Sequence, residues 1–251
     1  MSAFLETRQL GRTFGGLKAV DDVSMAIEQG ELVGLIGPNG AGKTTLFNLI
    51  SGFTTPTSGE VLLKGERIDG LTPHDIARRG IGRTFQNLRI FPNISVFDNV
   101  TVGAIGHENI GLGSIFPWQK AKSDRITHKS FEALEAVGLL ADADDLAANI
   151  SYGKRKYLEI ARALAMQPDL LILDEPAAGL NETETRHLAD FIRRLHREGR
   201  TIILIEHDMR LVMSICQRVI VLASGRKISD GTPERVQQDA GVLEAYLGVD
   251  E

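Results

Sequence analysis

The strongest chemical signal in the sequence is a glycine-rich run that ends in a lysine and two threonines, GPNGAGKTT at residues 37–45. An apolar strand-like segment precedes this run, and an apolar helical stretch, residues 46–50, follows it. Glycines let the backbone turn tightly around a phosphate, and the amides at a helix N-terminus present positive partial charge to it. Lys43 is suited to bridge the outer phosphates of a nucleotide, and the Thr44 hydroxyl is suited to ligate Mg²⁺. The context therefore favours a phosphate-binding loop over a glycine-rich turn without a ligand.

A second signal is a pair of carboxylates, Asp174 and Glu175, directly after the apolar segment 170–173. Ligands of open α/β folds bind at the carboxyl ends of the strands. We expect Asp174 to bind Mg²⁺ through water, because Mg²⁺ keeps much of its hydration shell. Glu175 would polarise a water aimed at the γ-phosphate, and a general base contributes roughly 10²–10⁴ in rate. The alternative is that two carboxylates merely end a strand at the surface.

The elements that must position these residues have two kinds of strand pattern. Segments that are apolar throughout are typical of parallel strands covered by helices on both faces; they are residues 32–36, 170–173, 202–205 and 219–222. Residues 23–27 alternate between apolar and polar, and residues 60–64 lie between turn glycines, which indicates an antiparallel layer. Residues 87–166 read as mostly helical, with a glycine-rich loop over 103–113. The prediction is an α/β P-loop NTPase core with a mostly parallel sheet, an antiparallel β subdomain and an inserted helical subdomain.

Composition and length exclude several classes. The chain has 251 residues, 43% apolar and 24% charged, with a formal net charge of −5, which is a poor match for nucleic acid. No apolar run approaches the ~18 residues of a membrane span, and residues 1–12 contain no apolar signal core, so we expect a cytosolic chain. The single cysteine, Cys216, excludes an intrachain disulfide. The length lies between one and two typical domains, as an inserted subdomain would explain.

A phosphate loop alone is compatible with GTPases, kinases and transport ATPases, but the guanine-reading pattern Asn-Lys-x-Asp is absent. Residues 149–155, NISYGKR, precede the Asp-Glu strand and open a helix. They resemble the signature sequence of ATP-binding cassette (ABC) proteins, in the form L-S-Y-G. The order of the other motifs agrees over nearly the whole chain: phosphate loop, Gln86, signature, Asp174-Glu175, the segment 178–181, and residues 206–208.

The resemblance implies roles for residues that the spacing alone does not explain. Ser151 and the amides around Gly153 would donate to the γ-phosphate of an ATP bound by the opposite subunit, although an ordinary N-cap serine is the alternative. His207 would contact the γ-phosphate and hold Glu175 and water in place. Gln86 would touch Mg²⁺ or water and report the nucleotide state to the membrane partner.

Phe14 precedes the first core strand, where ABC proteins commonly place an aromatic side chain against adenine. Such stacking is worth roughly 1–3 kcal/mol, and a buried core phenylalanine is the rival interpretation. The complete set of expected catalytic residues is Glu175, His207 and Lys43. The expected nucleotide contacts are Phe14, Gly37, Pro38, Asn39, Gly40, Ala41, Gly42, Lys43, Thr44, Thr45, Gln86, Ser151 and Gly153, and the expected metal contacts are Thr44, Gln86 and Asp174.

Three positions depart from the majority ABC pattern: Tyr152 and Lys154 in the signature, and Asn181 where many members have Asp. With these residues, the motifs resemble those of the subfamily that serves branched-chain amino acid importers. The run RTFQNLRIF at 83–91, the extended segment 103–127 and the ending AYLG at 245–248 agree with that subfamily. Glu182 stands where the subfamily often has proline.

The resemblance therefore implies an ATP-hydrolysing, energy-coupling subunit of an importer for branched-chain amino acids, with ATP and Mg²⁺ as ligands. Its partners would be a second ABC ATPase subunit (a paralogue or itself), two transmembrane permease subunits and, indirectly, a solute-binding protein, at the cytoplasmic face of the plasma membrane. A single nucleotide-binding domain is expected, with residues 1–86 and 167–251 as the ATP-binding core and 87–166 as the helical subdomain. The alternatives are an ABC ATPase for urea, amides or lipopolysaccharide, a soluble non-transport ABC protein, and an ATP-binding switch without hydrolysis.

Overall fold

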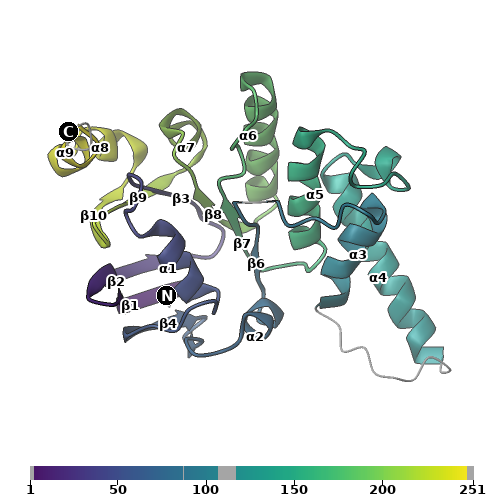
Figure 1. Ribbon diagram of the computed structural model, residues 1–251, viewed down its shortest axis with the longest axis horizontal. Helices are drawn as coiled ribbons and strands as arrows, with labels where there is room; N and C mark the ends of the chain where they lie inside the picture. The colour runs from purple at the N-terminus through teal and green to yellow at the C-terminus, as the bar shows by residue number, and fades with distance from the viewer. Residues whose placement is uncertain (1–2, 87, 107–116, 248–251) are drawn as a thin grey trace. The chain divides into compact units, whose positions relative to one another are not determined.

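The computed structural model describes residues 3–86, 88–106 and 117–247 of the chain (Figure 1). The chain forms two compact units, which are described separately: residues 1–76 with 185–251, and residues 77–184. The second unit is wider than the helical subdomain expected over 87–166, because it includes two strands. That expected subdivision stays a prediction.

The first unit contains an antiparallel sheet in the order β2-β1-β4-β5. Its strands are β1 (Leu5–Phe14), β2 (Leu17–Ile27), β4 (Ser58–Leu63) and β5 (Glu66–Arg67). The predicted antiparallel strands are confirmed in β2 and β4, and the long partner strand β1 was not predicted. Two β-bulge-like register shifts lie in β1 between Thr7 and Arg12, and Gln9 there has a positive φ of 47°.

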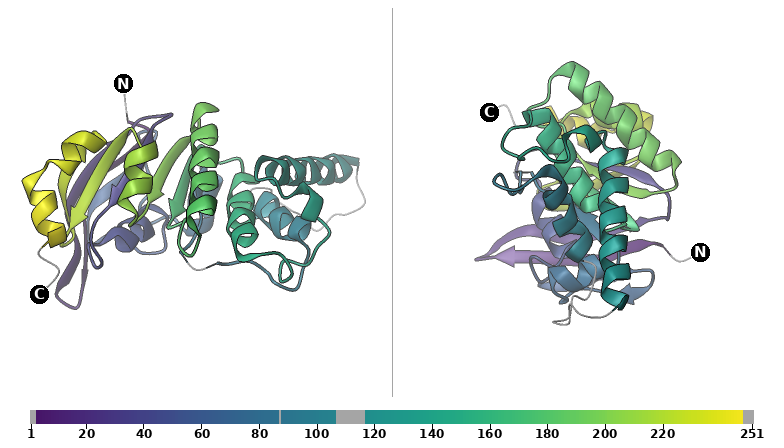
Figure 2. Two further views of the ribbon diagram at one scale, coloured as in Figure 1. Left: turned by 90° about the horizontal axis from the view of Figure 1, so that it is seen from above. Right: turned by 90° about the vertical axis from the view of Figure 1, so that its right-hand side faces the viewer.

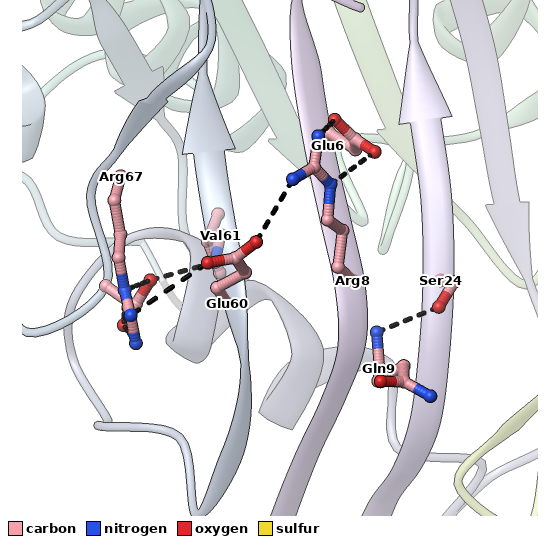
Figure 3. Close-up of polar contacts among 8 residues, drawn as sticks. Glu6, Arg8, Gln9, Ser24, Glu60, Val61 and Arg67 are labelled. Carbon is pink, nitrogen blue, oxygen red and sulfur yellow. Dashed lines mark hydrogen bonds and ion pairs between the residues drawn. The ribbon is translucent and has the colours of Figure 1, made fainter.

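One face of this antiparallel sheet carries a row of ion pairs across its strands (Figure 3). The Arg8 guanidinium lies 2.7 Å from a Glu6 carboxylate oxygen and 3.2 Å from one of Glu60, and hydrogen bonding to Arg8 lowers the pKa of Glu6. Beside the row, the backbone amide of Gln9 donates to the Ser24 hydroxyl at 2.8 Å. This bond gives the Gln9 amide a partner at the register shift between Thr7 and Leu10. Because exposed ion pairs contribute little to stability, this row adds little to the stability of the sheet.

The first unit also contains a sheet built on β3 (Leu32–Ile36), which pairs in parallel with both β8 (Thr201–Ile205) and β9 (Arg218–Ala223). Strand β10 (Arg226–Gly231) continues the sheet antiparallel to β9. Every residue of β3 and β8 is buried, which confirms these as parallel strands covered on both faces. The remaining helices of this unit are α1 (Lys43–Ile50), α7 (Met209–Ile215), α8 (Pro233–Gln237) and α9 (Ala240–Leu247).

Two helices cross the boundary between the units in sequence, α2 (Pro73–Arg78) and α6 (Glu182–Arg197). The start of α2 has the expected cap, because the Thr72 hydroxyl accepts from the Asp75 amide at 3.2 Å. Helix α6 buries Leu188, Ile192 and Leu195 along one face. Its last turn is followed by Gly199, whose φ of 87° ends the helix as the sequence predicts.

The second unit pairs the short strand β6 (Ile81–Arg83) in parallel with β7 (Leu170–Asp174). Its helices are α3 (Val96–Gly106), α4 (Pro117–Ala136) and α5 (Tyr152–Leu164), with a 3₁₀ turn at Leu140–Asp142. Helix α3 packs against both α4 and α5, and the views in Figure 2 show α3 and α4 side by side. In the described part of residues 87–166, the mostly helical character that the sequence predicts is confirmed by these three helices.

The glycine-rich loop expected over 103–113 is wrong at its start, because residues 103–106 close helix α3. A Cβ at Gly103 would lie 2.2 Å from the Arg162 carbonyl oxygen, so this glycine serves the close approach of α3 to α5. Residues 107–113 of the expected loop, and Gly248 of the expected ending, lie outside the described residues. In the part of the chain that the structure describes, no helix combines the length and apolarity that crossing a membrane requires.

Candidate functional site

The phosphate loop of the first unit joins β3 to α1, as the sequence predicts. Its two glycines at 37 and 42 face the backbone of neighbouring strands. A Cβ at Gly42 would lie 2.3 Å from the Ala19 carbonyl oxygen, and one at Gly37 would lie 2.2 Å from that of Leu222. Gly42 also has a φ of 98° at the N-cap of α1. Only glycine fits these positions, so the loop is shaped by the strands around it.

Lys43 lies buried beneath the loop that it follows. Its Nζ donates to the carbonyl oxygens of Gly37, at 2.6 Å, and Pro38, at 3.0 Å. The Gly225 amide in the β9–β10 turn donates to the Ala41 carbonyl at 3.0 Å and supports the loop from outside. Thr44, in the first turn of α1, is exposed. The ammonium group of Lys43 and the helix N-terminal amides are hydrogen-bond donors of the kind that phosphates need. The accessible Thr44 hydroxyl is an oxygen ligand of the kind that Mg²⁺ takes.

Two further predicted residues lie in the first unit. Phe14 is 45% exposed at the end of β1, with the Arg12 guanidinium 4.5 Å from its ring centre, so the interpretation as a core phenylalanine is wrong. His207 follows β8 and is exposed. Its Nδ1 lies 3.8 Å from an oxygen of Glu206, a fully buried carboxylate that also accepts from the His207 amide at 3.3 Å. Glu206 thus fixes the backbone from which the histidine projects.

The second unit positions the predicted carboxylate Asp174 at the end of β7. Asp174 is buried, which excludes the alternative that it merely ends a strand at the surface. Its Oδ2 lies 2.9 Å from the Arg83 guanidinium, and its amide donates to the Thr84 hydroxyl at 3.1 Å. Because a buried ion pair gains little net energy, its main effect is to fix the direction of the carboxylate.

The next residue, Glu175, has a backbone φ of 48°, which non-glycine residues rarely adopt. Such a conformation costs about 1–3 kcal/mol and is concentrated at functional sites. The Gln86 side-chain amide donates to Glu175 Oε2 at 2.8 Å, and Lys156 Nζ donates to the Glu175 carbonyl at 3.4 Å. The structure therefore brings together two predicted site residues, Gln86 and Glu175, that are 89 positions apart in sequence.

The signature residues lie at the N-terminus of α5. Ser151 is the N-cap of this helix, and its hydroxyl accepts from the Lys154 amide at 3.3 Å, as an ordinary capping serine does. Tyr152 donates from its hydroxyl to the Ala178 carbonyl at 3.2 Å. A Cβ on Gly179 would lie 2.9 Å from the Tyr152 ring, so the ring packs on the segment after Glu175. The unusual tyrosine in the signature thus has a structural partner.

Several buried charged residues near these positions were not predicted. They are Arg83, Lys156, Glu159 and Glu206. Lys156 and Glu159 are one helical turn apart on the buried face of α5, beside Ile160. Charged residues at apolar positions of a helix or next to a buried strand are the signal that could have identified them, because such groups are rarely buried without a partner.

Predicted site residues are thus divided between the units. Those in residues 14–45 and His207 belong to the first unit, whereas Gln86, Ser151, Gly153, Asp174 and Glu175 belong to the second. Among the described residues, no group of three or more His, Cys, Asp or Glu side chains could hold a metal alone. Thr44 in the first unit and Asp174 in the second each carry an oxygen of the kind that Mg²⁺ takes, and this ion needs only one or two carboxylates when substrate phosphates and waters complete its shell.

Comparisons with known proteins give one consistent result. Residues 20–178 match the ABC transporter family, and residues 226–251 match the branched-chain amino acid ATP-binding cassette transporter family. The chain is 43% identical, over 97% of each chain, to the high-affinity branched-chain amino acid transport ATP-binding protein LivG of Escherichia coli. It is 44% identical, over 97% of each chain, to the corresponding protein BraF of Pseudomonas aeruginosa.

The solved structures agree with these sequence matches. A nucleotide-free ATP-binding cassette from an ABC transporter has a TM-score of 0.86 and 31% identity, covering 97% of this chain and 98% of that chain. An ATP-binding cassette in its ADP conformation has a TM-score of 0.85 and 29% identity, covering 99% of this chain and 100% of that chain. The similarity therefore includes the fold as well as the motifs.

Proposed function

Since this chain belongs to the ATP-binding proteins of ABC transporters, in the branched-chain amino acid type, we propose that its ATP hydrolysis drives the high-affinity import of branched-chain amino acids. The identity of 43–44% over 97% of the chain, to relatives named for this transport, is the observation that carries the proposal. The C-terminal match over residues 226–251, to a family described by the same transport, supports it independently of the ATP motifs.

In this proposal the first unit binds the nucleotide. Phe14, exposed at the end of β1, stacks on adenine. The loop amides of residues 37–45 surround the phosphates, and Lys43 contributes its ammonium charge to the outer ones. Stacking on Phe14 does not select strongly for ATP over GTP, because it makes little contact with the hydrogen-bonding edge of the base.

Thr44 and Asp174 would hold Mg²⁺, with Gln86 beside it, and the bound ion would neutralise charge on the β- and γ-phosphate oxygens. Glu175 accepts a proton from the attacking water. At the same time the water oxygen bonds to the γ-phosphorus, and the bond between the γ-phosphorus and the oxygen that leaves with ADP breaks. His207 holds the γ-phosphate and orients Glu175 and the water. Before that step, the hydrogen bond from Gln86 to Glu175 Oε2 keeps the base in a defined rotamer.

The signature residues serve a second ATPase subunit. Ser151 and the amides near Gly153, at the N-terminus of α5, donate to the γ-phosphate of the ATP that the second subunit binds. ATP binding then favours the closed pair, and hydrolysis releases it, because a ligand drives a conformational cycle only through differential affinity. A paralogue is the expected second subunit. Two permease subunits at the cytoplasmic face of the membrane, and indirectly a solute-binding protein, complete the transporter.

The role of Glu175 is tested with the variant Glu175→Gln. Glutamine keeps an oxygen for the Gln86 amide but cannot accept the proton of the attacking water, so hydrolysis should slow about a hundredfold or more. ATP binding should be preserved, since the phosphate contacts come from residues 37–45. Turnover and ATP binding by the full-length chain are the measurements.

The matched control is Glu182→Gln, which removes an exposed carboxylate at the start of α6. The control should keep wild-type turnover. Unchanged turnover in Glu175→Gln would remove Glu175 from the role of general base.

A further inference from the structure

A carboxylate outside the motif chemistry is buried in the second unit. Glu159, on α5, is only 6% exposed. An ionised carboxylate is costly to bury unless hydrogen bonds and charges compensate it. Burial raises the pKa of Glu159, and the backbone N–H groups of Phe85 and Arg89, with the charges of Lys156 and Arg162, oppose that rise. The surroundings of this carboxylate are therefore built from donors and cations.

The groups that face Glu159 lie on both sides of Gln86. The Phe85 amide donates to Glu159 Oε1 at 3.1 Å. The Arg162 guanidinium, one turn further along α5, donates to the Arg89 carbonyl. The Arg89 guanidinium in turn lies 4.1 Å from the centre of the Phe85 ring. Helix α5 thus holds the backbone before and after Gln86 with one acidic and one basic side chain.

The same helix also reaches the backbone of Glu175, the residue whose carboxylate Gln86 contacts. Gln86 donates to Glu175 Oε2 at 2.8 Å, and Lys156 donates to the Glu175 carbonyl at 3.4 Å. Side chains of α5 therefore contact the residue next to Gln86 and the backbone of Glu175. A shift of the Phe85 amide would move Gln86 relative to Glu175.

We propose that Glu159 is a positioning residue, which holds the Phe85 amide so that the Gln86 side chain stays within hydrogen-bonding distance of Glu175. The inference rests on the proposed roles of Gln86 and Glu175 in ATP hydrolysis. A carboxylate is needed here because it accepts from more than one N–H group. Glutamine in its place offers a single oxygen and turns an NH₂ group toward a donor.

Amide hydrogen exchange in the full-length Glu159→Gln variant tests the contact directly. The Phe85 amide should exchange about tenfold faster than in the wild type, because its acceptor loses the negative charge and charge-assisted hydrogen bonds are roughly twice as strong as neutral ones. The amides of β7, Leu170–Asp174, should keep their exchange rates. The control Glu132→Gln removes a solvent-exposed carboxylate of α4 and should leave all these rates unchanged. Unchanged exchange at Phe85, or loss of cooperative thermal unfolding in Glu159→Gln, would overturn the positioning role.

ATP turnover then tests the consequence of that position. Glu159→Gln should lower kcat about tenfold and leave the KM for ATP within about twofold, because the phosphate loop is not altered. In the background Gln86→Ala, the same substitution should have little further effect, since Glu159 acts through Gln86. Additive losses would overturn the proposal. Wild-type turnover in Gln86→Ala alone would instead contradict the role of Gln86, and the exchange at Phe85 would still decide whether Glu159 holds this backbone.

Discussion

Arg218 shows how a single side chain can join three strands of the first unit. Its guanidinium binds Asp230 in a bidentate manner, at 2.7 and 2.9 Å, and donates to the Ala26 carbonyl at 2.9 Å. Burial alone would raise the pKa of Asp230, but Arg218 and Lys227 outweigh it and hold that pKa below its ordinary value of 3.8. The pair therefore favours the folded state most when Asp230 is ionised.

This pair predicts a pH-dependent stability difference. A carboxyl group whose pKa is lowered on folding stabilises the protein fully above its unfolded pKa, near 3.8 here, and loses that contribution as the pH falls through the folded value. Asp230→Asn should therefore destabilise the protein by about 1–3 kcal/mol at pH 7. Urea unfolding at pH 7, 5, 4 and 3 should show a difference from wild type that is nearly constant at pH 7 and 5 and shrinks only below about pH 4.

The control for this prediction is Asp190→Asn, which removes an exposed partner of Arg193. Its effect should be small at every pH, as exposed pairs contribute little. A difference for Asp230→Asn that stays constant down to pH 3 would contradict the account of the Arg218 pair.

At the residue scale, the motifs indicate candidate residues for the chemistry but do not indicate what their side chains contact. The order of the motifs identified Gln86 and Glu175, whereas their hydrogen bond joins residues 89 positions apart. The pairing of Arg83 with Asp174 spans 91 positions. Such contacts depend on how strands and helices pack, so local spacing could not reveal them. The roles assigned to the site residues remain predictions.

At the element scale, the continuous apolar runs predicted β3, β7, β8 and β9 correctly, because buried parallel strands have few polar residues. Strand β1 was missed, since its irregular register interrupts the alternation on which a prediction depends. Strand β6 was missed because it has only three residues. The pattern of apolar and polar residues therefore predicts continuous buried strands better than short or irregular ones.

The contact between α7 and β3 gives a prediction at this scale. Gly34, in the middle of β3, faces α7, and a Cβ there would lie 2.4 Å from Val212 Cγ1 and 3.2 Å from Cys216 Sγ. Gly34→Ala should therefore overpack this interface and destabilise the protein by about 1–3 kcal/mol. Chemical unfolding of the variant measures this cost.

A double-mutant cycle separates the overpacking from other effects. Val212→Ala removes the clashing methyl group, so Gly34→Ala should cost clearly less in that background than in the wild type. An equal cost in both backgrounds would mean that the glycine is not required by α7.

At the scale of the whole molecule, the ABC ATPase fold and family predicted from the motif order are confirmed by the matches over nearly the whole chain. The chain is an ABC ATPase. In the proposed function its ATP hydrolysis drives the transport of a solute that this subunit does not contact. This is why the identity of the solute comes from relatives rather than from a pocket in the described residues.

The most direct test of the proposed function is ATP hydrolysis by the complete transporter in proteoliposomes, with the solute-binding protein present. Leucine, isoleucine and valine should stimulate turnover several-fold, and Glu175→Gln in this chain should abolish the stimulation. Urea, short amides and unrelated amino acids serve as comparison solutes. Stimulation by urea or an amide without stimulation by any branched-chain amino acid would contradict the proposed function.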